Sequence, residues 1–169
     1  MSVCIITTGG TFDKVYFDAK GGYEIGDPMI GSILEEGGVT LPCRIQPLLR
    51  KDSLELTDAD RLQIVQAVDD ALESRIVIIH GTDTMPQTAD ALRGRPGKTI
   101  VLTGAMSPAR FRCSDASFNA GFALAAVQAL PEGVYIAMNG QLFLAGQVRK
   151  NVALGRFEAL AESGASDGV

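Results

Sequence analysis

Residues 75–84 read Arg75-Ile-Val-Ile-Ile-His-Gly-Thr-Asp-Thr84, an unbroken apolar run that leads directly into glycine, hydroxyl and carboxylate side chains. Such a run, without polar alternation, is typical of a strand that a parallel sheet buries on both faces. Similar runs cover residues 3–7, 99–103 and 134–138, and residues 43–49 form a weaker candidate. The sequence therefore predicts several buried strands, most of which end at glycine or threonine.

Helical segments alternate with these strands. Residues 57–60 have the pattern of a capping box, with a threonine hydroxyl and an aspartate carboxylate three positions apart. Shorter and longer helices are predicted over residues 88–92 and 114–130, which precede glycine and proline. After the capping box, an apolar stripe is expected through to about residue 73, made of Leu62, Val65, Val68 and Leu72. This order predicts an α/β fold: a doubly wound, flavodoxin-like or Rossmann-like, mainly parallel sheet with right-handed crossovers.

The chain length of 169 residues fits one domain, and a hydrophobic fraction of 46% is enough for a packed core. We expect this domain over residues 1–157 and a flexible tail over residues 158–169. The formal charge of -5 disfavours nucleic acids and acidic membrane surfaces as partners, because both attract basic proteins.

Cysteine and histidine are too sparse for a disulfide framework or a metal site. Cys4, Cys43 and Cys113 are widely spaced and form no C-x-x-C pair. The sole histidine, His80, ends a buried run and is interpreted as structural. The apolar run at residues 3–6 is too short for a signal peptide, and no segment approaches the ~20 apolar residues of a membrane span. We therefore expect a cytoplasmic protein without a metal.

Two threonine-rich loops are the candidate site. Residues 7–11 and 81–84 each follow a predicted strand, and ligands of doubly wound sheets bind outside the carboxyl ends of the strands. The first loop lacks the spacing of a phosphate loop, and a purely structural turn remains an equal alternative for both. A threonine nucleophile needs a base, and a lysine can serve if burial depresses its pKa. From its position alone, Lys150 is interpreted as a surface residue.

Five segments in the same order and spacing resemble the bacterial-type (type I/II) L-asparaginase family. The resemblance extends over roughly residues 2–150 and is specific because the five segments are in register. They are Thr8-Gly-Gly-Thr-Phe12, Asp52-Ser-Leu-Glu-Leu-Thr57, His80-Gly-Thr-Asp-Thr-Met85, Leu102-Thr-Gly-Ala-Met-Ser-Pro108 and Ser114-Asp-Ala-Ser-Phe-Asn119.

The resemblance implies hydrolysis of L-asparagine to L-aspartate and ammonia by double displacement, through an acyl-enzyme and without a cofactor or metal. Thr11 and Thr82 match the two family threonines, and either could attack first; Asp83 and Lys150 match the partners of Thr82. A tyrosine assists the first threonine: Tyr16 is favoured, and Tyr23 is the alternative, since Gly21-Gly22 predicts a hairpin turn beside it. The implied substrate-binding residues are Gly10, Asp52, Ser53, Thr82, Asp83, Ala105 and Met106, with Ser53 on the α-carboxylate and Asp83 on the α-ammonium group.

The family has a second, smaller α/β domain, whereas this sequence ends soon after Lys150, which indicates a short-chain form with the N-terminal domain only. In the family a neighbouring subunit's second domain completes the site, so a homodimer or homotetramer is expected here. The alternatives are a non-catalytic domain that binds a small amino acid, an amidase for glutamine or another amide, and the amide-hydrolysing subunit of a tRNA-linked amidotransferase. A nucleotide-binding module is disfavoured by the missing phosphate loop.

Overall fold

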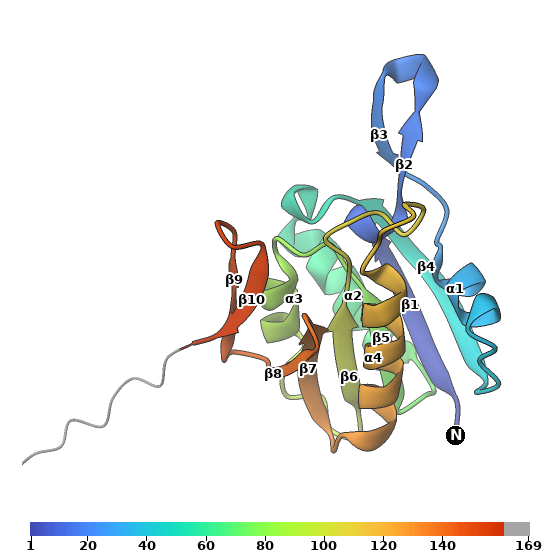
Figure 1. The fold of residues 1–169 in the computed structure, drawn as a ribbon. Helices are drawn as coiled ribbons and strands as arrows, with labels where there is room; N and C mark the ends of the chain where they lie inside the picture. Colours follow the sequence, from blue (N-terminus) through green and yellow to red (C-terminus); the bar gives the residue numbers. More distant parts are fainter. Residues whose placement is uncertain (161–169) are drawn as a thin grey trace, which may run out of the picture.

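A six-stranded sheet runs through the centre of the computed structural model, which describes residues 1–160 (Figure 1). Its strand order is β4-β1-β5-β6-β7-β8; the first five are parallel, and β8 is antiparallel to β7. This is the order of a flavodoxin-like sheet with one added edge strand. The strands are β1 (Val3–Gly9), β4 (Cys43–Lys51), β5 (Arg75–Ile79), β6 (Thr99–Thr103), β7 (Gly133–Met138) and β8 (Gln141–Leu144).

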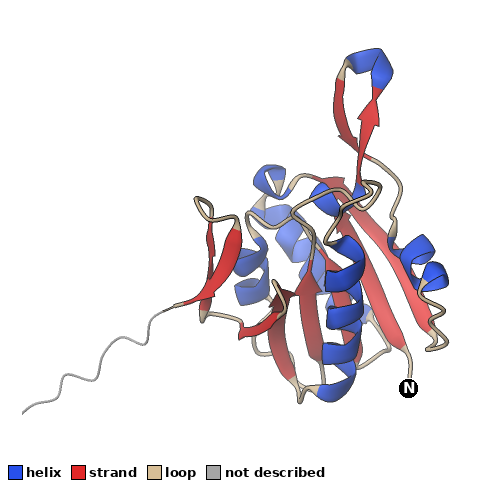
Figure 2. Cartoon of the chain, in the orientation of Figure 1, coloured by secondary structure: helices blue, strands red, loops and turns tan. Residues whose placement is uncertain are grey.

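Helices cover both faces of the sheet (Figure 2). α1 (Ile30–Glu36) and α4 (Ala116–Ala129) pack on one face, and α2 (Asp58–Asp70) and α3 (Met85–Ala91) pack on the other. The predicted doubly wound α/β fold is therefore confirmed. Within residues 1–160, no helix is long and apolar enough to span a membrane.

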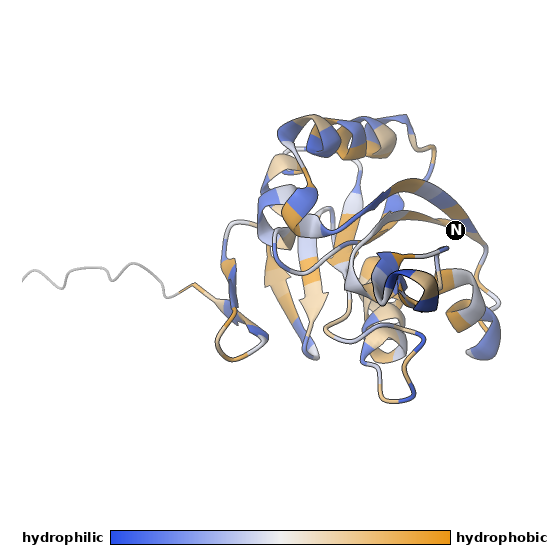
Figure 3. Cartoon of the chain, turned by 90° about the horizontal axis from the view of Figure 1, so that it is seen from above, coloured by the Kyte–Doolittle hydropathy of each residue, from blue (hydrophilic) through white to orange (hydrophobic). Residues whose placement is uncertain are grey.

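The apolar runs form strands because each residue has a hydrophobic partner above or below the sheet. In β5, Ile76 and Ile78 pack with the α2 and α3 side, whereas Val77 and Ile79 pack with the α1 and α4 side. Seen from above, the inner strands carry mostly hydrophobic residues (Figure 3). Burial on both faces explains why the sequence shows continuous runs instead of alternation.

The capping box of α2 is present: Thr57 Oγ1 accepts from the Asp60 N–H, and the Asp60 carboxylate accepts from the Thr57 N–H. The predicted apolar stripe is wrong at its ends. Leu62 is 68% exposed, and Leu72 lies beyond the helix and is 99% exposed. The buried side chains beside Val68 are instead Ile64, Ala67 and Ala71.

The other predicted helices differ only at their ends. α4 begins two residues later than residue 114 and ends one residue before 130. α3 begins at Met85 rather than at residue 88; Pro86 in its first turn is compatible with a helix start, because that position needs no N–H donor. α1 was not predicted from the sequence.

Two hairpins project from the sheet core. The first comprises β2 (Lys14–Phe17) and β3 (Gly22–Ile25), joined by a short 3-10 turn η2 (Asp18–Lys20), with Gly21 at a φ of 62° (Figure 1). The second comprises β9 (Val148–Asn151) and β10 (Arg156–Ala159). Because β10 crosses residue 157, the predicted start of the tail at residue 158 falls within a strand; residues 161–169 lie outside the described part of the chain.

Candidate functional site

Two glycines bring the threonine-rich loops into contact at the carboxyl ends of β1 and β5. Gly10 has a φ of 75°, and a Cβ built on it would lie 2.5 Å from the Gly81 Cα. Only glycine permits both this φ and this close approach. Thr11 directly follows Gly10, and Thr82 directly follows Gly81. The contact between the two glycines therefore brings the backbones of the two threonine-rich loops together. β1 and β5 flank the topological switch point, where such sheets bind ligands.

Lys150 lies within hydrogen-bond distance of two predicted catalytic residues. Its Nζ donates to Thr82 Oγ1 at 2.8 Å and to Asp83 Oδ1 at 2.6 Å. The Lys150 side chain is 12% exposed, and Thr82 is 4% exposed. The interpretation of Lys150 as a surface residue, made from its position alone, is therefore wrong: β9 carries its side chain inward.

The position of Lys150 depends on residues that sequence reasoning missed. In the β9–β10 ladder Lys150 pairs with Phe157, which is 2% exposed and belongs to the core on the α2 and α3 side. Val148, at the start of β9, is buried in the same core. The Phe157 N–H also donates to Asn139 Oδ1 at 2.9 Å, which ties the hairpin to the β7–β8 turn. An isolated buried aromatic seven residues after a lysine gives no motif, so these contacts were not predicted.

Ser53 lies beneath the second threonine loop. Asp52 caps the 3-10 turn η3 (Ser53–Glu55), and Ser53 is 1% exposed. Ser53 Oγ accepts from the Asp83 N–H at 3.2 Å, and its carbonyl accepts from Thr84 Oγ1 at 2.7 Å. A Cβ on Gly81 would lie 2.6 Å from the Ser53 Cβ. Ser53 is therefore packed against the Thr82–Asp83 segment, and its role in binding substrate remains a prediction.

Asp52 forms an ion pair with Lys14, whose Nζ is 2.8 Å from Asp52 Oδ2. Burial raises the pKa of the Asp52 carboxyl, but hydrogen bonds from Lys14 and the Leu54 N–H, with the nearby charge of Lys150, hold it below its usual range. The Asp52 carboxyl is thus ionised near pH 7, paired with Lys14. The sequence alone assigned no role to Lys14.

The loop after β6 carries Ala105 and Met106. Ala105 is buried, and the Met106 N–H donates to the Asp115 carboxylate. Asp115 also accepts from the Ser107 N–H and from Asn119 Nδ2. The Asp115 and Asn119 side chains therefore fix the shape of this loop, and their predicted segment, residues 114–119, has a clear structural role. The substrate-binding roles of Ala105 and Met106 remain predictions.

Tyr16 and Tyr23 face each other across the first hairpin. They are register partners in β2 and β3, and their ring centroids are 5.5 Å apart. Tyr16 is 51% exposed and Tyr23 is 55% exposed, and Tyr23 also contacts the ring of Phe111. Both tyrosines lie on the projecting hairpin, so the choice between them remains a prediction.

His80 is a buried structural residue, as predicted. It is 0% exposed; its Nε2 is 2.9 Å from Thr88 Oγ1, and its Nδ1 is 2.7 Å from the Gly81 carbonyl. Burial lowers the pKa of His80 to about 4, so the ring is neutral near pH 7.

Asp13, two residues after Thr11, was not singled out in the sequence. Its side chain is 1% exposed and accepts from the Met29 N–H at 2.9 Å, while its carbonyl accepts from the Gly26 N–H at 2.8 Å. Burial raises the pKa of Asp13 to about 6, although the Met29 bond and the guanidinium groups of Arg110 and Arg50 act in the opposite direction. Asp13 thus links the chain before β2 to the chain after β3, at the base of the first hairpin.

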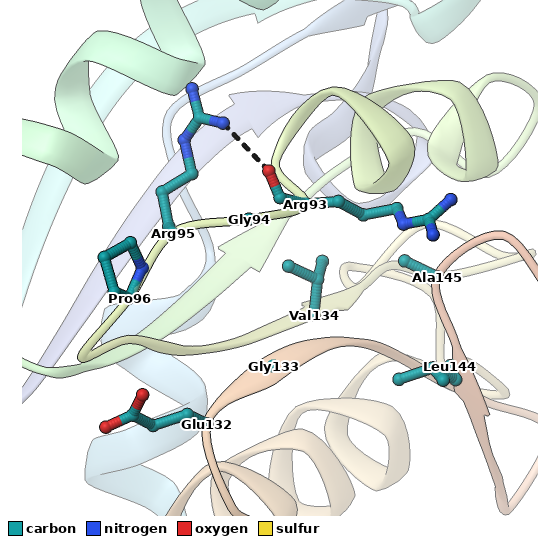
Figure 4. Close-up of a pocket in the computed structure, with 9 residues that line it drawn as sticks. All are labelled: Arg93, Gly94, Arg95, Pro96, Glu132, Gly133, Val134, Leu144 and Ala145. Atoms are coloured by element: carbon teal, nitrogen blue, oxygen red, sulfur yellow. Dashed lines mark hydrogen bonds between the residues drawn. The ribbon is translucent and has the colours of Figure 1, made fainter.

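Two cavities lie away from this cluster. One, of 530 Å³, opens between the loop after α3, the start of β7 and the end of β8 (Figure 4). Another, of 380 Å³, lies between α1 and α4. We assign the site by the Thr82–Lys150–Asp83 contacts instead of by cavity size, because those contacts bring chemically competent groups together. Within residues 1–160, no group of three or more histidine, cysteine, aspartate or glutamate side chains is arranged to hold a metal ion.

The sheet is flavodoxin-like, its two threonine-rich loops lie at the switch point, and a lysine is hydrogen-bonded to one of these loops. The molecule is therefore a doubly wound α/β protein with a hydroxyl–lysine–carboxylate site. Comparison with known proteins gives its family. The family model "Asparaginase, N-terminal" matches residues 2–164. The chain therefore belongs to the asparaginase family.

Individual relatives agree with this assignment. The chain is similar to an L-asparaginase of Thermococcus kodakarensis, with 32% identity over 163 residues, which cover 92% of this chain and 49% of the relative. It is also similar to a glutaminase-asparaginase of Acinetobacter glutaminasificans, with 29% identity over 97% of this chain and 54% of the relative. The solved thermostable L-asparaginase from Thermococcus kodakarensis superimposes with a TM-score of 0.83 at 30% identity, covering 94% of this chain and 51% of the other. The chain thus spans about half the length of the curated relatives it matches.

Proposed function

We propose that this chain is an amidohydrolase that converts L-asparagine to L-aspartate and ammonia through a threonine nucleophile and an acyl-enzyme. The observation that carries the proposal is the Lys150 Nζ, 2.8 Å from Thr82 Oγ1 and 2.6 Å from Asp83 Oδ1. A hydroxyl in direct contact with a lysine, itself oriented by a carboxylate, can accept a proton from an attacking water molecule or can itself be activated as a nucleophile.

In the proposed reaction, Thr11 Oγ1 attacks the side-chain amide carbon, and its proton passes to the departing ammonia. The bond to nitrogen breaks and an ester to Thr11 remains. A water molecule, deprotonated through Thr82 and Lys150, then attacks this ester and releases aspartate and the Thr11 hydroxyl. Backbone N–H groups of the glycine-rich loops are suited to stabilise the negative oxygen at both steps. The reverse order, with Thr82 as the first nucleophile, is the alternative.

We assign the remaining predicted residues to this reaction in the same way. Tyr16 assists Thr11, with Tyr23 as the alternative, because both lie on the hairpin that begins at Lys14. Asp83 binds the α-ammonium group of the substrate, and Ser53 lies below it against the same loop. The loop residues Ala105 and Met106, together with Gly10 and Asp52, complete the proposed substrate contacts. No cofactor or metal is needed for this chemistry.

Two other functions compete with this proposal. Glutamine is the first alternative substrate, because one relative is a glutaminase-asparaginase and one extra methylene changes binding by only about 1–3 kcal/mol. A non-catalytic domain that binds a small amino acid is the second. It is disfavoured because Thr11, Thr82, Asp83 and Lys150 are all present.

Ammonia release from L-asparagine and L-glutamine by the purified protein tests the proposal. We expect Thr11→Ala, Thr82→Ala and Lys150→Met each to lose at least about a hundredfold in kcat, the usual size of a lost nucleophile or proton-transfer group. The exposed Thr40 provides a matched control, and Thr40→Ala should retain wild-type activity.

A wild-type protein that releases no ammonia, or full activity in both threonine variants, would contradict this mechanism. Calorimetric binding of asparagine without turnover would instead support the amino-acid-binding domain.

We also propose that the protein works in the cytoplasm as a homodimer or homotetramer. The cytoplasm is favoured by the free thiols of Cys4, Cys43 and Cys113. An oligomer is favoured by the resemblance, in which a neighbouring subunit completes the site.

A further inference from the structure

Lys14, the first residue of β2, places an ammonium group beside the predicted substrate-binding segment. Its Nζ is 2.8 Å from Asp52 Oδ2, and the side chains are 29% and 27% exposed. The Lys14 backbone N–H also donates to the Thr11 carbonyl, which closes the short 3-10 turn η1 (Thr11–Asp13). The Lys14 backbone is therefore tied to that of Thr11, and its ammonium group lies beside the residue that follows β4.

The neighbouring side chains offer few hydrogen-bond donors to a substrate carboxylate. Ser53 is 1% exposed, and its hydroxyl oxygen already accepts the Asp83 N–H, so it offers a single neutral donor. The more accessible group next to it is the Asp52 carboxylate, whose charge would repel a second carboxylate. The Lys14 ammonium group, paired with Asp52, offsets this repulsion.

Lys14 is the lysine with donors to spare at this position. An ammonium group has three N–H donors, and the ion pair with Asp52 uses one of them. Lys150 directs two of its donors to Thr82 and Asp83, where the proposed chemistry requires them. Lys14 can therefore keep Asp52 in place and still donate to a bound anion.

We propose that Lys14 binds the α-carboxylate of the amide substrate, together with the Ser53 hydroxyl. This inference rests on the proposed function and deepens it, since it restricts the preferred substrates to amides that carry a carboxylate. It separates the two ends of the substrate: Asp83 holds the ammonium group, and Lys14 holds the carboxylate. The competing explanation is that the Lys14–Asp52 pair only fastens the first hairpin to the end of β4.

A comparison of two substrates distinguishes these explanations. β-Alaninamide is asparagine without its α-carboxylate, so it keeps the amide and the ammonium group. We expect Lys14→Met to raise KM for asparagine by about ten- to a hundredfold, the value of one charge-assisted hydrogen bond. KM for β-alaninamide should change less than about twofold, because the lost partner is absent from that substrate. Lys14→Arg should recover most of the affinity for asparagine.

Lys20 provides the matched control on the same hairpin. It is more exposed, it pairs with Glu24, and Lys20→Met should leave both substrates unaffected. Equal effects of Lys14→Met on both substrates, or on neither, would overturn the inference in favour of a structural pair.

If the wild-type protein hydrolyses neither compound, the proposed function fails, and calorimetric binding of asparagine decides the role of Lys14. Loss of binding in Lys14→Met but not in Lys20→Met would support the carboxylate contact. Equal binding by both variants, or no binding by the wild-type protein, would overturn it.

Discussion

At the residue scale, two buried titratable groups lie close to the threonine loops, and their pKa values are shifted in opposite directions. Burial keeps His80 neutral by lowering its pKa to about 4, and it keeps Asp13 protonated further into the neutral range by raising its pKa to about 6. Each shift makes folding depend on pH. Between about pH 4 and 6 the unfolded chain binds a proton at His80 more readily, whereas the folded chain binds one more readily at Asp13.

Asp13→Asn isolates the second of these effects. Above its ordinary pKa of 3.8 the unfolded carboxyl ionises, but the folded one keeps its proton up to about pH 6. The wild-type protein should therefore lose up to about 3 kcal/mol of unfolding free energy, relative to the Asn variant, as the pH rises from 4 to 7. Urea denaturation of both proteins across this range measures the difference. The contribution of His80 is common to both and cancels; a difference independent of pH would contradict the prediction.

At the element scale, the site depends on how closely the loops after β1, β4 and β5 approach one another. A Cβ on Gly81 would lie 2.6 Å from the Ser53 Cβ and 3.0 Å from the Ser53 N. A side chain at Gly81 could be accommodated only if the backbone moved and separated Thr82 from Ser53. The close approach of these loops therefore couples local packing directly to the proposed chemistry.

Gly81→Ala tests this coupling. We expect a loss of about 1–3 kcal/mol in the free energy of unfolding, from overpacking, together with a large fall in ammonia release. Gly121 in α4 provides the control, because a Cβ there meets nothing within 4 Å. Gly121→Ala should gain about 0.5–1 kcal/mol and keep its activity. Thermal and urea denaturation measure both; an equally stable and active Gly81→Ala would show that the loops can separate freely.

The first hairpin carries the second element-scale prediction. Tyr16 and Tyr23 have similar exposure, but Tyr23 also packs against Phe111, which gives it a structural contact that Tyr16 lacks. We therefore expect Tyr16→Phe to reduce kcat about tenfold or more, and Tyr23→Phe to have a smaller effect, because only the hydroxyl is removed. Steady-state kinetics with asparagine compares them, and the opposite ranking would assign the role to Tyr23.

At the scale of the whole molecule, the described domain brings Lys150 into contact with Thr82 and Asp83, but the chain covers about half the length of its matched relatives. If a second subunit completes the substrate site, the mass measured by light scattering should be two or four times the 17.8 kDa of the chain. Specific activity should also fall on dilution below the dissociation constant of the oligomer. A fully active monomer would remove the need for a neighbouring subunit.

Local patterns predicted the fold well. A strand buried on both faces needs consecutive apolar residues, and a capped helix start needs particular residues three positions apart, so both can be identified from a short stretch of sequence. The runs of β1, β5, β6 and β7 and the capping box at Thr57 are such cases. The exposed Leu62 and Leu72 show the limit of the same reasoning: hydrophobic spacing identifies a helix, but neighbouring elements decide which of its sides is buried.

The sequence by itself determined the parallel sheet, the two threonine loops and, through the order of its motifs, the family. The resemblance implied that Lys150 meets Thr82, but only the tertiary structure decided how β9 turns this side chain inward, that Ser53 lies covered beneath Gly81, and that Lys14 pairs with Asp52. Periodicity records the environment of a residue along its own strand or helix. Contacts such as Lys150 with Thr82, 68 residues apart, arise only when the packing of Phe157 and the close approach of Gly10 and Gly81 bring distant segments together.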